Sequence, residues 1–247
     1  MSNQVLQKRK NLKQHARGHG KMPGAERRFF VSNQALEKEL VLNGAEHNHL
    51  ANVLRLRVGE EVIIICGDEF DYRYEIISIT KSQSNIRLIK KSPNKYNPEK
   101  NLTVYMGIIK HDNLALAVEK LNEIGVTEVV LFKSVNPQNI PVKIEKLQAT
   151  ANQSCRQCGR SIPLKVRGVI GFAELPSGAV FADEKEKSQK IQNANAIIIG
   201  PEGGFTDSER EQLRKIATPV SLGSRILRSE TAAIAGATLM LSKLGEI

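Results

Sequence analysis

Short apolar strand patterns alternate with amphipathic helix patterns from residue 102 onward, and this alternation restricts the fold more than any other feature. Strands are expected at residues 102–109, Glu128–Lys133, 179–182, Ala196–Ile199 and 219–222. Helices are expected from an N-cap at Asp112 to Gly125, over Ile144–Cys158, from the capping box at Thr206 and over residues 231–244. Such alternation is typical of an α/β domain with a mostly parallel sheet. The last helix is apolar on nearly every side, which predicts burial on several faces, often in a subunit interface.

The N-terminal third has a different pattern, that of a small β-barrel. Residues 26–92 contain several short strand patterns, a turn signal at Gly67 and one short helix near residues 47–53 whose Leu50, Val53 and Leu54 share a face. Residues 93–100 include two prolines and two asparagines, which suit neither a strand nor a helix and predict a linker. Residues 101–247 then form the α/β domain.

Basic residues are concentrated at the N-terminus. The chain has a net charge of +10, and residues 1–25 carry six Lys or Arg without any acidic residue. We predict a disordered basic arm there, and such an arm indicates a polyanionic partner, most often a nucleic acid. A tail that only aids solubility is the alternative. The chain has no Trp and 4% aromatic residues, so an aromatic stacking platform for single strands is not expected.

The sequence also indicates the compartment. No apolar run approaches the ~20 residues that span a bilayer, and the N-terminus lacks the apolar region of a secretory signal. Three cysteines are a small and odd number, which disfavours a disulfide framework. We therefore expect a cytoplasmic protein with no membrane partner. Cys155 and Cys158 are accompanied by neither a second pair nor a His cluster, so no metal site is predicted.

A glycine-rich loop is the first candidate site. Three glycines, Gly200, Gly203 and Gly204, follow a buried strand and precede the capped helix. Glycines let a backbone approach a ligand closely, and ligands of open α/β sheets lie at the carboxyl ends of the strands. The spacing is neither that of a dinucleotide-binding fingerprint nor that of a P-loop. A tight turn that simply leads into a helix is the alternative.

Residues 221–232 form the second candidate site. They also lie between a strand and a helix, and they place two arginines and a glutamate in one loop. Arg228 keeps its charge at any working pH, so it can act as an electrostatic clamp or a phosphate ligand but not as a base. The alternative is that Ser229 or Thr231 caps the last helix, with Glu230 as a partner of the helix dipole.

Together the two loops resemble a known family. GPEGGF at 200–205 followed by LGSRILRSETA at 222–232 is similar to ribosomal RNA small-subunit methyltransferase E, uridine-N3 methyltransferases of 16S rRNA in the SPOUT superfamily. Other stretches agree in order along residues 27–244, namely RRFF at 27–30, HLANVLRLRVG at 49–59, KLNEIGV at 120–126 and QSCRQCGRSIP at 153–163. The chain departs from the family pattern at residues 135–140 and at 181–184, and the arm at 1–25 lies outside the resemblance.

The resemblance implies both a fold and an activity. It implies a PUA-like β-barrel followed by a trefoil-knotted SPOUT methyltransferase domain, assembled as a homodimer. It implies S-adenosylmethionine as the cofactor, methylation of N3 of a uridine in 16S rRNA of the small ribosomal subunit, and no metal. RNA would lie across the barrel of one subunit and the knotted domain of the other.

The resemblance also implies roles for individual residues. The cofactor would be held by Ala182, Ile199, Gly200, Pro201, Glu202, Gly203, Gly204, Leu222, Gly223, Ile226, Leu227, Arg228, Thr231 and Ala232. Catalytic roles would fall to Arg228, to Arg27 or Arg28 from the barrel, and to Glu230. RNA contacts would fall to Arg27, Arg28, Arg55, Arg156 and Arg160. Two alternatives remain open, a SPOUT methyltransferase with another RNA target such as a ribose 2′-hydroxyl, and a non-catalytic RNA-binding homologue.

Overall fold

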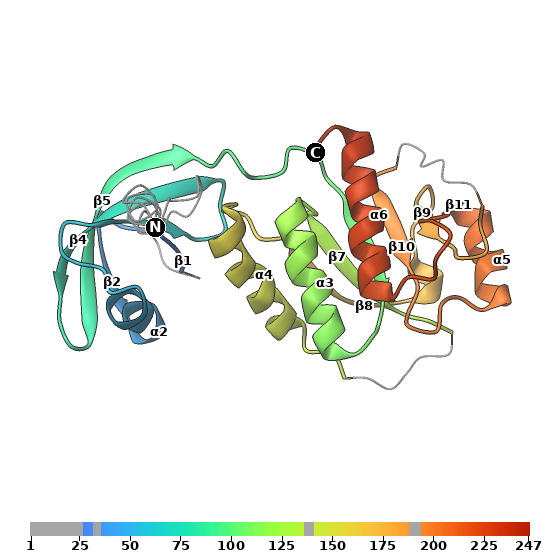
Figure 1. Ribbon diagram of the computed structural model, residues 1–247, viewed down its shortest axis with the longest axis horizontal. Coiled ribbons are helices and arrows are strands. Elements are labelled where there is room, and N and C mark those ends of the chain that lie inside the picture. Colours follow the sequence, from blue (N-terminus) through green and yellow to red (C-terminus); the bar gives the residue numbers. More distant parts are fainter. Residues whose placement is uncertain (1–26, 32–35, 136–140, 188–193) are drawn as a thin grey trace, which may run out of the picture.

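The computed structural model describes residues 27–31, 36–135, 141–187 and 194–247. These residues form two lobes, one built on a small sheet near the N-terminus and one on a larger sheet covered by helices (Figure 1). The basic arm at 1–25 lies outside the described residues, as does most of the divergent stretch at 135–140.

The N-terminal lobe contains a five-stranded sheet in the order β1-β3-β4-β5-β2. Its strands are β1 (Arg28–Phe30), β2 (Glu39–Asn43), β3 (Glu61–Ile65), β4 (Phe70–Ile79) and β5 (Gln83–Pro93). The pair β1 and β3 is parallel, and the other neighbours are antiparallel. Alternate side chains of these strands, such as Tyr74, Ile76 and Ile86, point inward and form one core with Phe29 and Leu50.

The short helix of this lobe differs from the prediction. It consists of α2 (Gly44–Asn48) and a π-helical segment, η1 (His49–Val53), and so begins before residue 47. Leu50 is buried, but Val53 is 60% and Leu54 38% exposed, so the shared apolar face was predicted wrongly. The π-helical turn changes the angle between successive side chains, and this turns the last two away from the core.

The C-terminal lobe contains a six-stranded sheet in the order β11-β9-β10-β6-β7-β8. Its strands are β6 (Thr103–Gly107), β7 (Glu128–Lys133), β8 (Lys165–Gly171), β9 (Val180–Ala182), β10 (Ala196–Ile199) and β11 (Thr218–Val220). Every neighbouring pair is parallel, which confirms the predicted α/β class. Strand β8 was not predicted. It is an edge strand in which Val166 is buried between the exposed Lys165 and Arg167, and its interior contains Gly168, so it lacks an apolar run.

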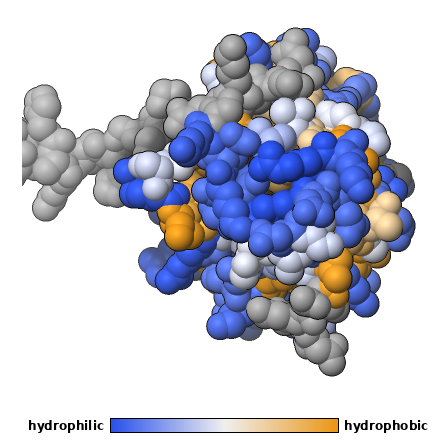
Figure 2. Space-filling view, turned by 90° about the vertical axis from the view of Figure 1, so that its right-hand side faces the viewer, coloured by the Kyte–Doolittle hydropathy of each residue, from blue (hydrophilic) through white to orange (hydrophobic). Residues whose placement is uncertain are grey.

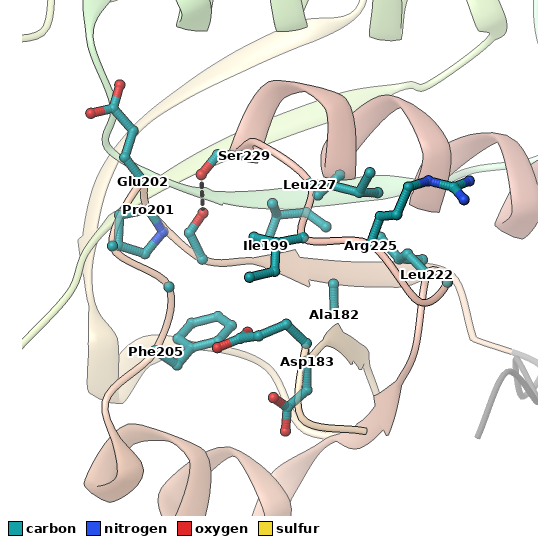
Figure 3. Close-up of a pocket in the computed structure, with 17 residues that line it drawn as sticks. Ala182, Asp183, Ile199, Pro201, Glu202, Phe205, Leu222, Arg225, Leu227 and Ser229 are labelled. Carbon is teal, nitrogen blue, oxygen red and sulfur yellow. Dashed lines mark hydrogen bonds between the residues drawn. The ribbon is translucent and has the colours of Figure 1, made fainter. Parts of the chain in front are cut away.

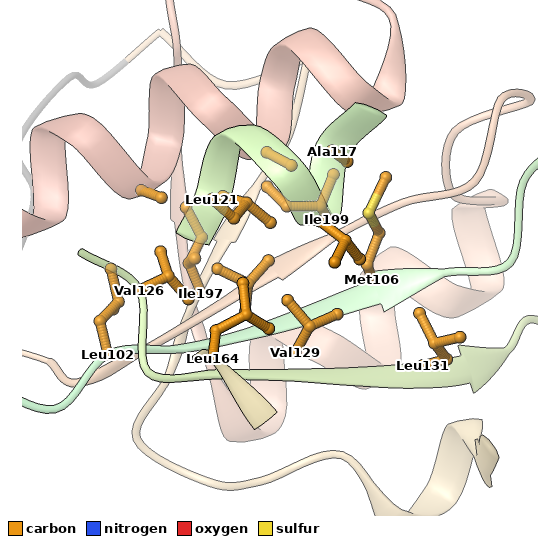
Figure 4. Close-up of a cluster of buried hydrophobic side chains, with 14 of the residues drawn as sticks. Leu102, Met106, Ala117, Leu121, Val126, Val129, Leu131, Leu164, Ile197 and Ile199 are labelled. Carbon is orange, nitrogen blue, oxygen red and sulfur yellow. The ribbon is translucent and has the colours of Figure 1, made fainter. Parts of the chain in front are cut away.

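Helices cover both faces of this sheet. On one face α3 (His111–Ile124), α4 (Ile144–Cys158) and α6 (Ser229–Leu244) pack on a large apolar core (Figures 1 and 4). On the other face α5 (Asp207–Ile216) and the 3-10 turn η2 (Phe172–Glu174) pack on a second core. Successive residues of β10 serve the two cores in turn, with Ile197 and Ile199 in the first and Ile198 in the second.

The helix ends agree with the sequence signals in two of three cases. Gly125 ends α3 with φ 106, as predicted. Thr206 caps α5 in a capping box, since its Oγ1 accepts from the Glu209 N–H at 3.2 Å and its own N–H donates to that carboxylate at 2.8 Å. Asp112 was predicted to be an N-cap, but it lies in the first turn of α3, and Lys110 occupies the cap position.

The two lobes meet along the end of α4. Cys155 of this helix packs against Ile63 and Ile65 of β3 and against Phe30. The segment after α4 is bonded to the barrel and the linker, because Ser161 Oγ donates to Asp68 O at 2.7 Å and Asn94 Nδ2 donates to Gly159 O at 2.8 Å. The lobes are therefore joined by packing as well as by the chain.

Candidate active site

A pocket of about 290 Å³ lies at the carboxyl ends of β9, β10 and β11 (Figure 3). Three loops meet there, each following one of these parallel strands, at the edge where open α/β sheets bind ligands. The pocket is lined by Ala182, Asp183, Glu184, Ile199, Gly200, Pro201, Glu202, Gly203, Gly204, Phe205, Leu222, Gly223, Arg225, Ile226, Leu227, Ser229 and Ala232.

The loop after β10 is held close to the sheet by its neighbours. A Cβ on Gly107, at the end of β6, would stand 2.6 Å from Pro201 N, so this approach requires a glycine. Phe205 closes the loop by packing between the rings of Phe132 and Phe181. Gly203 has open space on this side of the chain, because a Cβ built there would meet no atom within 4 Å.

The loop after β11 is tied to the loop after β10. Ser229, the first residue of α6, donates from its Oγ to Gly200 O at 2.8 Å (Figure 3). Gly223 has φ 126, a conformation that side chains disfavour, and it turns the chain toward the pocket rim. Beyond this turn Ile226 is 88% exposed and Arg225 is also exposed. The loop therefore presents one apolar and one cationic side chain at the mouth.

The loop after β9 adds two ion-paired carboxylates to the wall of the pocket. Asp183 is buried and accepts from Arg210 Nε at 3.0 Å and from Arg214 at 2.9 Å. Glu184 also accepts from Arg210 and lies against Gly204. Arg210 belongs to α5, so these ion pairs fix the β9 loop to the helix that the β10 loop leads into. Lys185, from the same loop, hydrogen bonds to Asp207 and lowers the pKa of that carboxyl.

Most residues predicted for the cofactor lie around this pocket. Only Arg228 and Thr231 of that set are outside its lining: Arg228 is the exposed N-cap residue of α6, and Thr231 is exposed on the same helix. The lining residues that were not predicted are Asp183, Glu184, Phe205, Arg225 and Ser229. Their signal in the sequence was position, since each lies within two residues of a predicted residue.

The predicted catalytic residues do not all meet here. Glu230 is buried in the first turn of α6 and does not line the pocket. Arg27 pairs with Glu60 at 2.5 Å in the other lobe, far from β9–β11 of the same chain (Figure 1). Arg28 was predicted as the alternative to Arg27 in catalysis and as an RNA contact, and in the structure its side chain is turned into the interior. Its guanidinium is buried and bonded to both oxygens of Asp71, at 2.8 and 2.7 Å.

The other predicted RNA contacts divide into three cases. Arg55 is exposed and has φ 53, the single positive value among the described non-glycine residues. The Arg156 guanidinium lies 5.5 Å from the ring centre of Phe29, at the joint of the lobes. Arg160 was predicted wrongly, because it is 2% exposed and donates to the carbonyl oxygens of Asn122, Val126 and Ile162. Burial turns this cation into a part of the core.

Comparison with known proteins identifies the family. The model of an RNA methyltransferase domain matches residues 96–241, and that of an RNA methyltransferase PUA domain matches residues 42–89. A ribosomal RNA small subunit methyltransferase E from Rickettsia conorii is 30% identical over 224 residues, which cover 84% of this chain and 91% of that protein. The chain belongs to the ribosomal RNA small subunit methyltransferase E family. The family member from Bacillus subtilis is 27% identical and covers 83% of this chain and 92% of its own length.

Solved structures of the family have the same architecture. The small subunit methyltransferase E of Neisseria gonorrhoeae, bound to S-adenosyl methionine, has a TM-score of 0.77 at 25% identity and covers 88% of this chain and 98% of its own. A predicted RNA methyltransferase from Thermotoga maritima has a TM-score of 0.71 at 27% identity and covers 88% of this chain and 99% of its own.

None of the helices in the described ranges is long and apolar enough to cross a membrane.

Proposed function

We propose that this chain transfers a methyl group from S-adenosylmethionine to N3 of a specific uridine in the 16S rRNA of the small ribosomal subunit, in the cytoplasm. The observation that carries the proposal is the pocket itself. Two loops with the sequence of the family motifs meet at the carboxyl ends of β10 and β11, and Ser229 ties them together. The family names and the bound cofactor of the Neisseria gonorrhoeae protein support the same activity.

The residues of the pocket fit the cofactor. A volume of about 290 Å³ is near the lower end of small-molecule pockets, which hold roughly 300–1,000 Å³. Ile199, Leu222 and Leu227 give an apolar surface suited to an adenine ring. Asp183 and Glu184 add polar groups to the wall, and their negative charges are paired with Arg210 and Arg214. The open space at Gly203 leaves room for the ligand where any larger residue would place its Cβ.

Chemistry at uracil N3 needs stabilisation of an anion. When bound, S-adenosylmethionine supplies an electrophilic methyl group that requires no metal. The N3–H of uracil is a weak acid, and its lone pair becomes free to attack once the proton has left. The negative charge then spreads over O2, O4 and N3, and a nearby guanidinium stabilises it. Arg228, exposed at the start of α6 and beside the pocket rim, is our candidate for this role.

We further propose that two chains cooperate. Arg27 directly precedes β1, which belongs to the other lobe and is separated from β9–β11 by α4 and α3 (Figure 1), so we infer that it acts on RNA held by the pocket of a second chain. The end of the molecule that carries α5 is largely hydrophilic (Figure 2). The layer of α3 and α6 instead exposes Leu116 and Leu239, 44% and 46% accessible, and we place the dimer contact there. The trefoil knot implied by the resemblance stays a prediction.

The activity can be tested with the whole chain and small ribosomal subunits from a strain that lacks the gene. We expect N3-methyluridine at one position of the 16S rRNA, detected by nuclease digestion and mass spectrometry, and dependent on S-adenosylmethionine. Methylation of a ribose 2′-hydroxyl would replace the uridine-N3 assignment. Absence of cofactor binding by calorimetry would favour a non-catalytic RNA-binding protein.

A further inference from the structure

Two cysteines lie side by side at the joint of the lobes, outside the pocket. Cys155 and Cys158 are three residues apart in the last turn of α4, so they share one face of the helix. The Nδ2 of Asn122, from α3, lies 3.6 Å from the sulfur of Cys155 and 3.7 Å from that of Cys158. One amide therefore contacts both sulfurs.

The two thiols have different surroundings. Cys155 is fully buried against β3 of the other lobe. Cys158 is partly exposed and lines a polar cavity of about 450 Å³ between the linker, α3 and the C-terminus. The charged residues around that cavity are Lys95, Glu99, Glu123, Arg160 and Glu246. A small polar reagent can thus reach Cys158, whereas Cys155 is closed to solvent.

Electrostatics separate the two thiols further. A hydrogen bond from the Cys155 thiol lowers the pKa of Cys158, helped by the backbone N–H and the charge of Arg160 and opposed by burial and by the charge of Glu123. The same hydrogen bond and burial raise the pKa of Cys155. The C-terminal end of α4 disfavours an anion. The positive charge of Arg160 favours the anion instead. Its buried guanidinium hydrogen bonds to carbonyl oxygens, and these carry no full negative charge that would neutralise it.

We propose that Cys158 and Cys155 form an oxidation site that takes a peroxide and closes to a disulfide. Cys158 is the attacking sulfur, and Cys155 is the thiol that resolves the oxidised product. In the described part of the chain no group of three or more His, Cys, Asp or Glu side chains could hold a metal ion. The modification does not depend on the proposed methyl transfer.

The reaction balances in two steps. The Cys158 thiolate attacks one oxygen of hydrogen peroxide, the O–O bond breaks, and a sulfenic acid and hydroxide form, so sulfur loses two electrons and the peroxide gains them. The Cys155 sulfur then attacks the Cys158 sulfur, and the S–O bond breaks. The leaving hydroxide takes the Cys155 proton and departs as water. A dithiol reductant restores both thiols.

Disulfide formation would change the end of α4, where the two lobes are in contact. Cβ atoms three residues apart on a helix are about 5–6 Å apart, and a disulfide needs roughly 3.5–4.5 Å, so the last turn of α4 has to tighten. Gly159 directly follows Cys158 and accepts a hydrogen bond from Asn94 of the linker segment, and Ser161, two residues further on, donates one to Asp68 of the N-terminal lobe. We therefore expect oxidation to loosen the contact between the lobes and to leave the pocket intact.

The test treats the full-length protein with hydrogen peroxide, blocks free thiols with N-ethylmaleimide and maps the peptides by mass. We expect a reversible Cys155–Cys158 disulfide in the wild type and in the matched control Cys66→Ser. Cys155→Ser should stop at a sulfenic acid on Cys158, trapped by dimedone. Cys158→Ser should leave Cys155 reduced. Hydrogen exchange at residues 94–97 and 159–162 should speed up on oxidation, while S-adenosylmethionine affinity stays unchanged.

Alkylation kinetics on the reduced wild type test the proposal without any variant. Burial raises the pKa of Cys66, so this thiol is the internal reference. At neutral pH iodoacetamide should label Cys158 about tenfold faster than Cys66 or more, since the thiolate is the reactive form. Equal labelling rates, or oxidation of Cys66 before Cys158, would overturn the proposal. So would a Cys155→Ser variant whose Cys158 yields no dimedone adduct.

Discussion

Gly203 is the residue whose change most directly separates ligand binding from folding. A Cβ at this position meets no atom within 4 Å, so Gly203→Val should fold normally and extend a branched side chain into the pocket. We expect S-adenosylmethionine affinity to fall by about 100-fold or more, measured by calorimetry. Gly168→Val is the matched control, because Gly168 also has open space and lies on the edge strand β8, away from the pocket. Wild-type affinity in Gly203→Val would contradict the cofactor assignment.

Arg228 can be tested at the same scale. Arg228→Lys keeps one positive charge but loses the planar fork that reaches two oxygens of a uracil anion. We expect turnover at saturating RNA to fall roughly 100-fold, as when one preorganised donor is deleted, with little change in RNA affinity. Arg225→Lys is the comparison, since Arg225 lines the pocket rim while Arg228 does not. A larger turnover loss in Arg225→Lys would move the catalytic role to Arg225.

At the scale of elements, the end of β6 determines how closely the loop after β10 can approach the sheet. Gly107→Ala would place a Cβ 2.6 Å from Pro201 N, and a backbone atom cannot move aside without shifting the loop. We expect a loss of about 1–3 kcal/mol in the free energy of unfolding, the usual cost of overpacking, together with weaker cofactor binding. Chemical denaturation and calorimetry measure the two effects. Gly168→Ala, with no neighbour within 4 Å, should show neither.

Helix α6 provides the test of the proposed dimer. Leu239 is 46% exposed on a helix whose other face is buried in the core. Leu239→Asp should give monomers in sedimentation experiments without unfolding the chain, because the charge replaces an apolar contact between subunits. Gln212→Asp, exposed on α5 against the opposite face of the sheet, should remain dimeric. An unchanged dimer in Leu239→Asp would place the subunit contact on another surface.

At the scale of the whole molecule, the basic arm and the pocket should contribute to different quantities. Removal of residues 1–25 eliminates six Lys or Arg. We expect weaker RNA binding and a salt dependence flatter by up to about 0.7–0.9 log units per lost phosphate contact. Turnover at saturating RNA should survive, since the pocket is unchanged. Filter binding at several salt concentrations measures the slope, and an unchanged slope would leave the arm with a role in solubility alone.

Sequence alone determined the elements whose signals are local. The strands at 128–133 and 196–199, the helix over 144–158 and the capping box at Thr206 were predicted with correct bounds, because hydrophobic period and capping chemistry act over a few residues. The glycine loop was singled out for the same reason, since its motif consists of residues adjacent in the chain.

Tertiary structure alone decided which charged and small side chains meet across the fold. Nothing in the sequence shows that Arg28 and Arg160 are buried. In the structure Arg28 hydrogen bonds to Asp71, and Arg160 hydrogen bonds to three carbonyl oxygens. Gly107 packs against Pro201, and Asp183 accepts a hydrogen bond from Arg210. The members of each pair are far apart in the sequence, so no local sequence pattern predicts these contacts. A buried charge is stable only with its partner, and which partner it finds depends on how distant segments pack.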